Sequence, residues 1–282
     1  MINILFWNTQ IGKDNKKNYD SEKKEVIDSY IIDLVKVYNC DIVILAEYDF
    51  DLSNLCDKIS VIGGDFKSWK TIQKSRVKII VQSKFVHELI RDNEHFVVYN
   101  VEMTNYEMIL AGVHFPSKRN SASNDQIFVM NNFILELEGA LREVTHNNIV
   151  IVGDFNANPY EGCMIDAIAM HSIPSSDIVQ KKGSRRVYRK EKNIYYNPMW
   201  NFLGDFGDIN GTCYYDSGGA IDMYWNIFDQ ALFSSDAIRF LDKSSIKIIT
   251  SVCNKSLLSS KGIPKRKEIS DHLPIFFSMK EE

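Results

Sequence analysis

A sandwich of two β-sheets with helices on its outer faces is the fold that this sequence predicts. Short apolar or alternating runs, which are typical of strands, recur from Ile2 to Phe277 and outnumber the helical segments. The two helical segments fall between strands, as helices do when they cover the outer faces of packed sheets. With 282 residues and 45% hydrophobic content, the chain can bury the large core that such a sandwich needs.

The expected strands share a continuous or alternating apolar pattern. In chain order they are Ile2–Trp7, Ile42–Ala46, Val77–Val81, Phe96–Glu102, Met108–Val113, Ile149–Val152, Ala231–Ser234, Ile246–Ser251 and Ile275–Ser278. Helical spacing occurs in Glu22–Tyr38, where Val26, Ile31 and Leu34 share one face, and again in Asp125–Val144. No Pro/Ser-rich, low-complexity or repeated stretch separates these elements, so we expect a single domain over residues 1–282.

The cysteines and the N-terminal segment both favour a cytoplasmic protein. The five cysteines are an odd number, stand far apart and form no CxxC pair; they are Cys40, Cys56, Cys163, Cys213 and Cys253. We therefore expect reduced thiols and no structural zinc site. The first strand begins at Ile2 without the features of a secretion signal, and no segment approaches the ~20 apolar residues of a membrane helix.

Positive charge is unevenly distributed along a chain whose net charge is −4. Seven cations against Glu191 alone give the segment between Gln180 and Asn193 a local charge of +6; they are Lys181, Lys182, Arg185, Arg186, Arg189, Lys190 and Lys192. The rest of the chain then carries −10. A smaller cluster around Arg266 and Lys267 precedes Ser270. Such runs are either solvated loops or surfaces that bind a polyanion, and the sequence leaves both readings open.

Polar residues follow four of the predicted strands at the point where each apolar core ends. They are Asn8 after Trp7, Glu47 after Ala46, His114 after Val113, and Asp154 with Asn156 after Val152-Gly153. Any one of them alone could be a buried polar group satisfied by the core. Because strands of packed sheets that end on one rim bring their terminal side chains together, the four endings jointly predict one site.

The string Gly153-Asp154-Phe155-Asn156-Ala157-Asn158-Pro159 resembles the central signature of the endonuclease/exonuclease/phosphatase superfamily. Further strings resemble that family's other signatures in the same order: Trp7-Asn8, Leu45-Ala46-Glu47, His114-Phe115-Pro116 and Ser270-Asp271-His272-Leu273-Pro274. Together they span nearly the whole chain. The resemblance implies an α/β (α+β) fold, a four-layered αββα sandwich in which two mostly antiparallel sheets are flanked by helices. It also implies a phosphoesterase that uses water directly rather than a covalent intermediate.

A phosphate ester is protected by its negative charge, so its hydrolysis needs a cation on the phosphoryl oxygens. Hard oxygen ligands such as Glu47 and Asp271 suit Mg²⁺, with Mn²⁺ as a substitute. We expect Glu47 to be the principal ligand, and the resemblance implies that Asn8 and Asp271 assist. Gln10 stands where some relatives carry a carboxylate, so the sequence leaves one or two metal positions open.

The resemblance also implies the remaining catalytic roles. Asp154 orients and deprotonates the attacking water, and Asn156 holds the scissile phosphate. His272 neutralises charge on the phosphoryl group, and His114 protonates the leaving oxygen. The alternative for His114 is a core histidine bonded to the backbone. The other four histidines lie outside any motif and are expected at surfaces or helix ends; they are His87, His95, His146 and His171.

Two aspartates compete as the carboxylate that orients His272. Asp222 follows Ile221 in a string similar to the family's Ile-Asp-Tyr, but it comes directly after a glycine-rich turn. Asp229 begins Asp229-Gln230-Ala231-Leu232-Phe233-Ser234, which resembles the family pattern of an aspartate followed by a strand that ends in serine. The preceding Trp225-Asn226 and the upstream Asn197-Pro198 resemble strings of some bacterial members. We therefore choose Asp229.

The family includes nucleases, phosphatases of inositol polyphosphates and sphingomyelinases, so the shared catalytic groups do not fix the substrate. The basic segment favours a polyanion, and we expect a nuclease whose nucleic-acid substrate is gripped by Lys181, Lys182, Arg185, Arg186 and Arg189. One alternative is a phosphatase or phosphodiesterase of small phosphorylated molecules or lipid headgroups. Another is a catalytically silent binding module.

Overall fold

The computed structural model describes residues 1–11, 17–117, 123–205, 207–218 and 222–281. Its first large sheet has six strands in the order β16-β19-β1-β2-β4-β3. These strands are β1 (Ile2–Ile11), β2 (Ile42–Tyr48), β3 (Phe66–Ser68), β4 (Val77–Gln82), β16 (Leu241–Ile248) and β19 (Ile275–Met279). Neighbouring strands are antiparallel except for the parallel pair β1 and β2.

The second large sheet has seven strands in the order β5-β6-β7-β8-β15-β12-β9. They are β5 (Val86–Asp92), β6 (Phe96–Glu102), β7 (Glu107–His114), β8 (Ile149–Asp154), β9 (Ser172–Ile173), β12 (Tyr195–Tyr196) and β15 (Asp229–Phe233). Pairing is antiparallel except for β7 with β8 and β9 with β12. Both sheets are thus mostly antiparallel, as the family resemblance implied.

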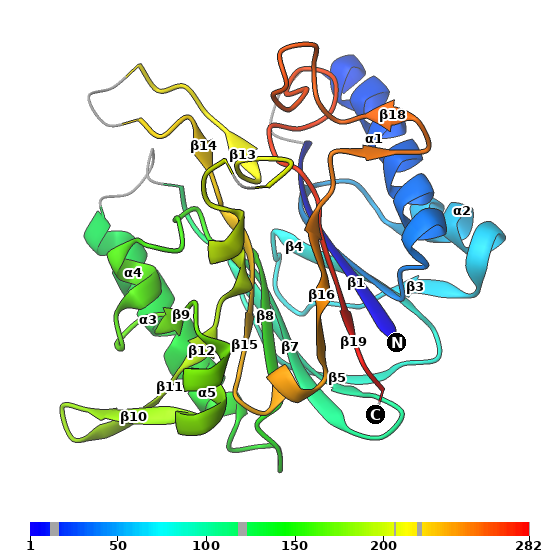
Figure 1. The fold of residues 1–282 in the computed structure, drawn as a ribbon. Coiled ribbons are helices and arrows are strands. Elements are labelled where there is room, and N and C mark those ends of the chain that lie inside the picture. Colours follow the sequence, from blue (N-terminus) through cyan, green and yellow to red (C-terminus); the bar gives the residue numbers. More distant parts are fainter. Residues whose placement is uncertain (12–16, 118–122, 206, 219–221, 282) are drawn as a thin grey trace.

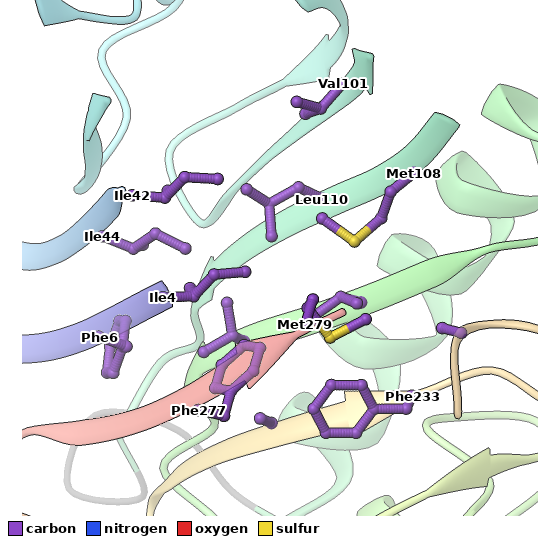
Figure 2. Close-up of a cluster of buried hydrophobic side chains, with 14 of the residues drawn as sticks. Ile4, Phe6, Ile42, Ile44, Val101, Met108, Leu110, Phe233, Phe277 and Met279 are labelled. Carbon is purple, nitrogen blue, oxygen red and sulfur yellow. The ribbon is translucent and has the colours of Figure 1, made fainter. Parts of the chain in front are cut away.

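The two sheets pack face to face around an apolar core (Figure 2), to which Phe6 and Ile44 contribute from one sheet and Leu110 and Phe233 from the other. Helices α1 (Lys17–Tyr38) and α2 (Ser53–Gly63) cover the outer face of the six-stranded sheet. Helices α3 (Ser123–Ala140) and α4 (Gly162–Ile165) cover the outer face of the seven-stranded sheet (Figure 1). The four-layered αββα sandwich is therefore confirmed. No helix in the described ranges is both long and apolar enough to cross a membrane.

Several elements differ from the sequence predictions. The expected strand Ile246–Ser251 straddles the end of β16 and the start of β17 (Ser251–Val252), which pairs with β18 (Lys255–Ser256). The second helix ends at Ala140 rather than Val144. Helix α2 was not predicted, although its buried residues Leu55, Cys56 and Ile59 stand at helical spacing. The half-exposed edge strand β5 had no clear apolar period. Other elements, like β3, α4, β9 and β12, are too short to leave a pattern: α5 (Ser176–Lys182), β10 (Ser184–Val187), β11 (Lys190–Asn193), β13 (Cys213–Tyr214), β14 (Trp225–Asn226), η1 (Pro198–Phe202) and η2 (Ala237–Arg239).

The strand directions bring the predicted polar endings to one rim. In the six-stranded sheet Asn8 lies opposite Ala46, which precedes Glu47. In the seven-stranded sheet His114 lies opposite Asp154, and Asp154 lies opposite Asp229 on the other side. An isolated bridge between Cys213 and His272 closes the same end of the sandwich.

Candidate active site

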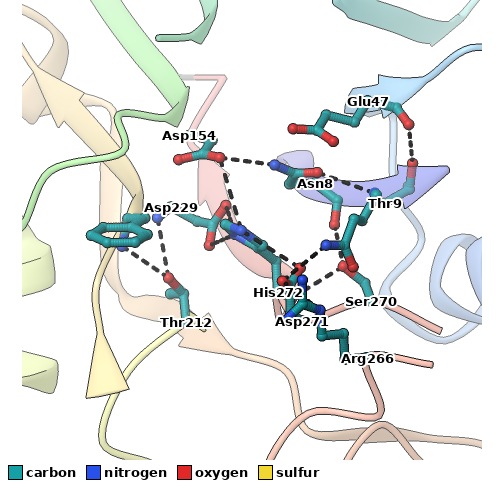
Figure 3. A network of polar contacts seen from close by, with 12 residues as sticks. Asn8, Thr9, Glu47, Asp154, Thr212, Asp229, Arg266, Ser270, Asp271 and His272 are labelled. Atoms are coloured by element: carbon teal, nitrogen blue, oxygen red, sulfur yellow. Dashed lines mark hydrogen bonds and ion pairs between the residues drawn. The ribbon is translucent and has the colours of Figure 1, made fainter. Parts of the chain in front are cut away.

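A cavity of about 1080 Å³ opens at this rim between the ends of the two sheets. It is lined by seven of the residues expected to act in catalysis or metal binding, namely Asn8, Glu47, His114, Asp154, Asn156, Asp271 and His272. The eighth, Asp229, is fully buried behind His272. Figure 3 shows six of these side chains approaching one another from separate strands and loops, namely Asn8, Glu47, Asp154, Asp229, Asp271 and His272. The residues that the sequence analysis singled out at the strand ends therefore lie together at one rim.

Asp154 is the centre of this group. Its Oδ2 atom accepts a hydrogen bond from Asn8 Nδ2 (2.8 Å), and its Oδ1 accepts from the backbone N–H of Asn156 (2.8 Å). Two imidazoles face the same Oδ2 atom, with His114 Nε2 at 3.7 Å and His272 Nε2 at 4.0 Å. A carboxylate held so firmly, yet lining the cavity, is suited to orient a water molecule and accept its proton.

Glycine at position 153 is required by the packing of β8 against β7. A Cβ atom there would lie 1.9 Å from the carbonyl oxygen of Val113, far inside van der Waals contact. Gly153 lets β8 approach β7 closely and carry Asp154 to the rim. This gives a physical reason for the glycine that precedes Asp154 in the signature string.

His272 forms a buried pair with Asp229. Its Nδ1 atom lies 2.8 Å from Asp229 Oδ2 and 3.1 Å from Oδ1. Burial raises the pKa of Asp229 to about 6, an effect that His272 partly offsets. Although burial by itself would lower the pKa of His272, the charges of Asp229, Cys213 and Asp154 raise it well above its ordinary value. At neutral pH the pair is therefore an imidazolium and a carboxylate, with Nε2 directed toward Asp154.

Hydrogen bonds to β1 and to the neighbouring loop hold this pair in place. Trp7 Nε1 donates to the carbonyl of His272 (3.0 Å), and Ser270 Oγ donates to the carbonyl of Asn8 (2.8 Å). Thr212 Oγ1 accepts from the backbone N–H groups of residue 228 (3.2 Å) and Asp229 (3.1 Å) (Figure 3). Trp7 and Ser270 in the signature strings thus serve to position the site.

The two strings that suggested a bacterial member also have a structural reason. Asn197 Nδ2 donates to Gln230 Oε1 (2.7 Å), and Gln230 Nε2 donates to the carbonyl of Ala157 (2.6 Å). Asn158 Nδ2 in turn donates to Asn226 Oδ1 (2.9 Å). These buried amides tie the loop after Asp154 to the segment that carries Asp229.

Asp222, the rejected alternative, lies on the edge of the cavity. Its carboxylate accepts hydrogen bonds from Ser217 Oγ (2.7 Å) and from the backbone N–H of Tyr224 (2.7 Å). These bonds lower the pKa of Asp222, that from the Ser217 side chain most strongly. Its neighbour Ile221 lies outside the described residues. The structure therefore gives His272 the partner that the sequence analysis chose.

His114 is buried, and its Nε2 atom lies 3.0 Å from Glu47 Oε1. Its Nδ1 atom has no hydrogen-bond partner within the described part of the chain, so the ring is not held by a backbone bond as a core histidine would be. The imidazole instead faces two carboxylates, those of Glu47 and Asp154. This environment suits a group that carries a proton during the reaction.

The oxygen atoms around Asp271 fit a hard cation. Gln10 Nε2 donates to Asp271 Oδ2 (2.9 Å), while Gln10 Oε1 and Asp271 Oδ1 are inaccessible to solvent and have no hydrogen-bond partner among the described residues. Buried acceptors without a donor are costly unless a cation or water satisfies them. Together with Asn8 and Glu47 in the same cavity, they supply the all-oxygen ligands that Mg²⁺ or Mn²⁺ prefers.

A second arrangement meets the spacing of a metal site, since ligand atoms of Asp154, Asp229 and His272 lie within 4.8 Å of one another. Within these three residues, the hydrogen bond between His272 Nδ1 and Asp229 already occupies one lone pair of the Asp229 carboxylate. A metal bound there would displace the proton that the raised pKa of His272 retains. We therefore favour the oxygen ligands of Glu47, Asn8 and Asp271.

Three basic residues that line the cavity were missed by the sequence analysis. His95, which was expected at a surface or helix end, lines the cavity with Arg76, beside Glu47 and His114. Lys23 of α1 is buried, and its Nζ donates to the carbonyl of Gln10 (3.1 Å). These residues come from isolated positions on separate elements, so no string of the sequence marks them.

The smaller basic cluster reaches the site, whereas the larger one does not. Arg266 and Lys267 line the cavity, and Arg266 Nε lies 3.5 Å from Asp271 Oδ2. The larger segment instead forms the end of α5 and the hairpin β10–β11, at the opposite end of the sandwich (Figure 1). The five residues expected to grip the substrate therefore lie away from the cavity. They are Lys181, Lys182, Arg185, Arg186 and Arg189.

No protein-family model and no curated protein matches this chain. Similar solved structures exist, however. TDP2 of D. rerio in complex with a single-stranded DNA product has a TM-score of 0.58 at 15% identity, with 99% of this chain and 98% of that chain covered. An endonuclease/exonuclease/phosphatase family protein of Bacteroides thetaiotaomicron has a TM-score of 0.58 at 10% identity, with coverages of 99% and 97%.

The endonuclease domain of TRAS1, a telomere-specific non-LTR retrotransposon, has a TM-score of 0.55 at 12% identity, with coverages of 99% and 98%. These likenesses extend over nearly the whole of each chain. This chain therefore has the fold of the endonuclease/exonuclease/phosphatase superfamily, as its motifs implied.

Proposed function

We propose that this protein is a magnesium-dependent phosphodiesterase that cleaves nucleic acid by direct attack of water. The observation that carries the proposal is the convergence on Asp154 Oδ2 of two imidazoles, His114 and His272, within one cavity. This arrangement holds a base for the water, a cation for the phosphoryl group and an acid for the leaving oxygen within a few ångströms.

The proposed reaction assigns each proton to a residue. Asp154 takes a proton from water as the new P–O bond forms, while Asn156 orients the phosphate. His272, kept cationic by Asp229, donates a hydrogen bond from Nε2 to a phosphoryl oxygen. The bond to the leaving oxygen breaks, and His114 gives that oxygen its proton.

Glu47, Asn8 and Asp271 would hold the metal, with Gln10 beside them. A bound Mg²⁺ supplies positive charge to the phosphoryl oxygens. No covalent intermediate is required, because Asp154 can act on water directly.

Cations on both sides of the proposed metal ligands support a nucleic-acid substrate. Along the six-stranded sheet, the order β19-β1-β2-β4 places Arg266 and Lys267, which precede β19, on one side of Asn8 and Glu47, and Arg76, which precedes β4, on the other. A phosphodiester chain could therefore continue past the reacting phosphate in both directions. Two of the similar structures are an endonuclease domain and a protein with a DNA product.

A cavity of about 1080 Å³ also admits a small phosphorylated molecule, so the test includes such substrates. Single- and double-stranded DNA, RNA, bis(p-nitrophenyl) phosphate, an inositol phosphate and a phospholipid headgroup are each incubated with Mg²⁺ and with excess chelator. We expect Mg²⁺-dependent cleavage of nucleic acid that Asp154→Asn abolishes. Turnover of only the small phosphates would establish the phosphatase alternative, and binding without cleavage of any substrate would establish a silent binding module.

A further inference from the structure

The basic segment that the active site does not use forms a surface of its own. Six exposed cations belong to it, and we call them together the basic hairpin: Lys181, Lys182, Arg185, Arg186, Arg189 and Lys190. The first two end helix α5, and the others lie on the ribbon β10–β11, which projects from the lower left of Figure 1. Within the described part of the chain, no ion pair neutralises any of the six.

Only one of these cations, Arg186, has an acidic residue opposite it in the ribbon, namely Glu191. Arg185 lies directly opposite Lys192 in the ribbon, an arrangement of like charges that destabilises a strand pair. Lys192 is itself buried and paired with Glu138 of α3 (2.7 Å), and Arg185 Nε donates to His171 Nε2 (2.8 Å). These two interactions anchor the base of the ribbon and leave the remaining cations directed to solvent.

The tip of the ribbon provides a second, independent observation. Tyr188 and Arg189 form its two-residue turn with φ values of 46° and 67°, a left-handed conformation that normally favours Asn and Gly. Tyr188 is 90% exposed, so no packing within the chain compensates for placing a bulky residue there. A strained, fully exposed aromatic residue among unpaired cations indicates contact with a partner.

We propose that the basic hairpin is a second nucleic-acid-binding surface, which holds a long substrate at a distance from the cavity where cleavage occurs. The inference rests on the proposed function for the identity of the polyanion. Lysine and arginine side chains match phosphates, a two-stranded ribbon fits the major groove of a duplex, and an exposed tyrosine can stack on a base. An acidic membrane is less suitable, because Tyr188 is the one exposed apolar side chain of the described ribbon.

The separation of the two surfaces sets the length of substrate that can reach both. Strand β7 runs from the hairpin end of the sandwich to His114 in the cavity, and its eight residues span roughly 23 Å. A duplex rises about 3.4 Å per base pair, so about seven or more base pairs are needed to reach from one to the other. Removing the hairpin cations should therefore weaken the binding of long nucleic acids and leave the binding of short ones unchanged.

The test compares two quadruple variants in which four cations become alanine. The hairpin variant changes Lys181, Lys182, Arg186 and Lys190; Arg185 is kept because it binds His171. The control variant changes the exposed lysines Lys36, Lys67, Lys70 and Lys74, which lie outside both the cavity and the hairpin and give the same change in net charge. Binding to a labelled 40-base-pair duplex is measured in chelator by fluorescence anisotropy over a range of salt concentrations.

We expect the hairpin variant to bind the duplex at least about tenfold more weakly than the wild type, while the control variant stays near it. The salt slope of the hairpin variant should fall by about 0.9 for each phosphate that its side chains no longer neutralise. Equal affinity and slope in the two variants would overturn the inference. Tyr188→Gly should weaken binding and at the same time raise the melting temperature, because glycine relieves the left-handed conformation.

Two further measurements separate this inference from the proposed function. Hydrolysis of bis(p-nitrophenyl) phosphate in Mg²⁺ should be the same in wild type and hairpin variant. If neither protein hydrolyses this compound or nucleic acid, the proposed function fails. The duplex-binding result then still decides whether the basic hairpin binds nucleic acid. Sedimentation with phosphatidylserine/phosphatidylcholine vesicles tests the other source of anionic charge. Hairpin-dependent binding to vesicles without binding to duplex would overturn the assignment to nucleic acid.

Discussion

His272 Nδ1 and Asp229 Oδ2 lie 2.8 Å apart in a buried contact that joins strand β15 to the segment before β19. The contact fixes which nitrogen of His272 faces the cavity, because Nδ1 is engaged and Nε2 remains directed toward Asp154. It also keeps the imidazole cationic, since the Asp229 carboxylate helps to raise the pKa of His272 despite its burial. The electrostatic role proposed for His272 thus depends on Asp229.

Asp229→Asn should lower turnover at least ~100-fold, the scale of a missing acid–base contribution, because the amide cannot stabilise the imidazolium. Asp222→Asn is the matched control at the edge of the same cavity and should cost less than ~10-fold, because its carboxylate bonds Ser217 rather than His272. Initial rates on a phosphodiester, at matched thermal stability, decide between them. The opposite ranking would show that Asp222 is the functional partner.

Metal dependence should follow the oxygen ligands. Glu47→Ala should lower activity by orders of magnitude and weaken Mn²⁺ binding measured by calorimetry, because it removes the principal carboxylate. Gln10→Ala should weaken Mn²⁺ binding less, since it removes only the neutral oxygen of an amide whose nitrogen bonds Asp271. Full activity in excess chelator would refute the metal requirement.

Thr212→Val tests the hydrogen bonds that hold the segment carrying Asp229 in place. Valine keeps the volume of the fully buried threonine but leaves the N–H groups of Phe228 and Asp229 without their acceptor. We expect the free energy of unfolding to fall by about 1–3 kcal/mol and kcat to fall with KM unchanged. The exposed Thr104→Val serves as the control, and a Thr212→Val protein with wild-type stability would show that water replaces the hydroxyl.

The stability of the fold should decrease in mild acid because of His171. Its Nδ1 lies 2.6 Å from the carbonyl of Asn193, and its Nε2 accepts from Arg185, so the ring must be neutral. Burial, above all, lowers the pKa of His171 below its ordinary 6.5. The stabilisation is therefore present above about pH 6.5 and is lost progressively as the pH falls below that value, through the lower pKa that His171 has in the folded protein.

His171→Gln should reduce this pH dependence, because the amide can donate and accept the same bonds without titrating. Urea unfolding at pH 8 and at pH 5.5 measures the effect. The wild type should lose more stability between pH 8 and pH 5.5 than the variant. Burial also lowers the pKa values of His95 and His146, so both proteins retain part of the pH dependence. Equal losses would mean that His171 accepts a proton without cost.

The sequence predicted the centre of the site better than its surroundings. Asn8, Glu47, His114 and Asp154 could be found because each ends an apolar strand, and strand direction brings such ends to one rim. Asp229 could be chosen because its string includes the strand β15 that follows it.

Lys23, Arg76 and His95 left no such signal, because each stands alone on a separate element and only tertiary packing brings it to the cavity. The position of the basic hairpin was unpredictable for a related reason. A run of charge reports that a segment is exposed but contains no information on which end of a sandwich the segment occupies.

Three residues at the cavity, Gln10, Glu47 and Asn156, share a left-handed backbone, with φ values of 51°, 51° and 49°. Asparagine tolerates this region, whereas Gln10 and Glu47 each cost roughly 1–2 kcal/mol there. Glycine at position 47 would relieve that cost, so Glu47→Gly should raise the melting temperature while it lowers turnover. Directed evolution of this chain for heat resistance alone would therefore accumulate glycine at the rim and progressively yield robust but inactive proteins, unless each round of selection also required cleavage.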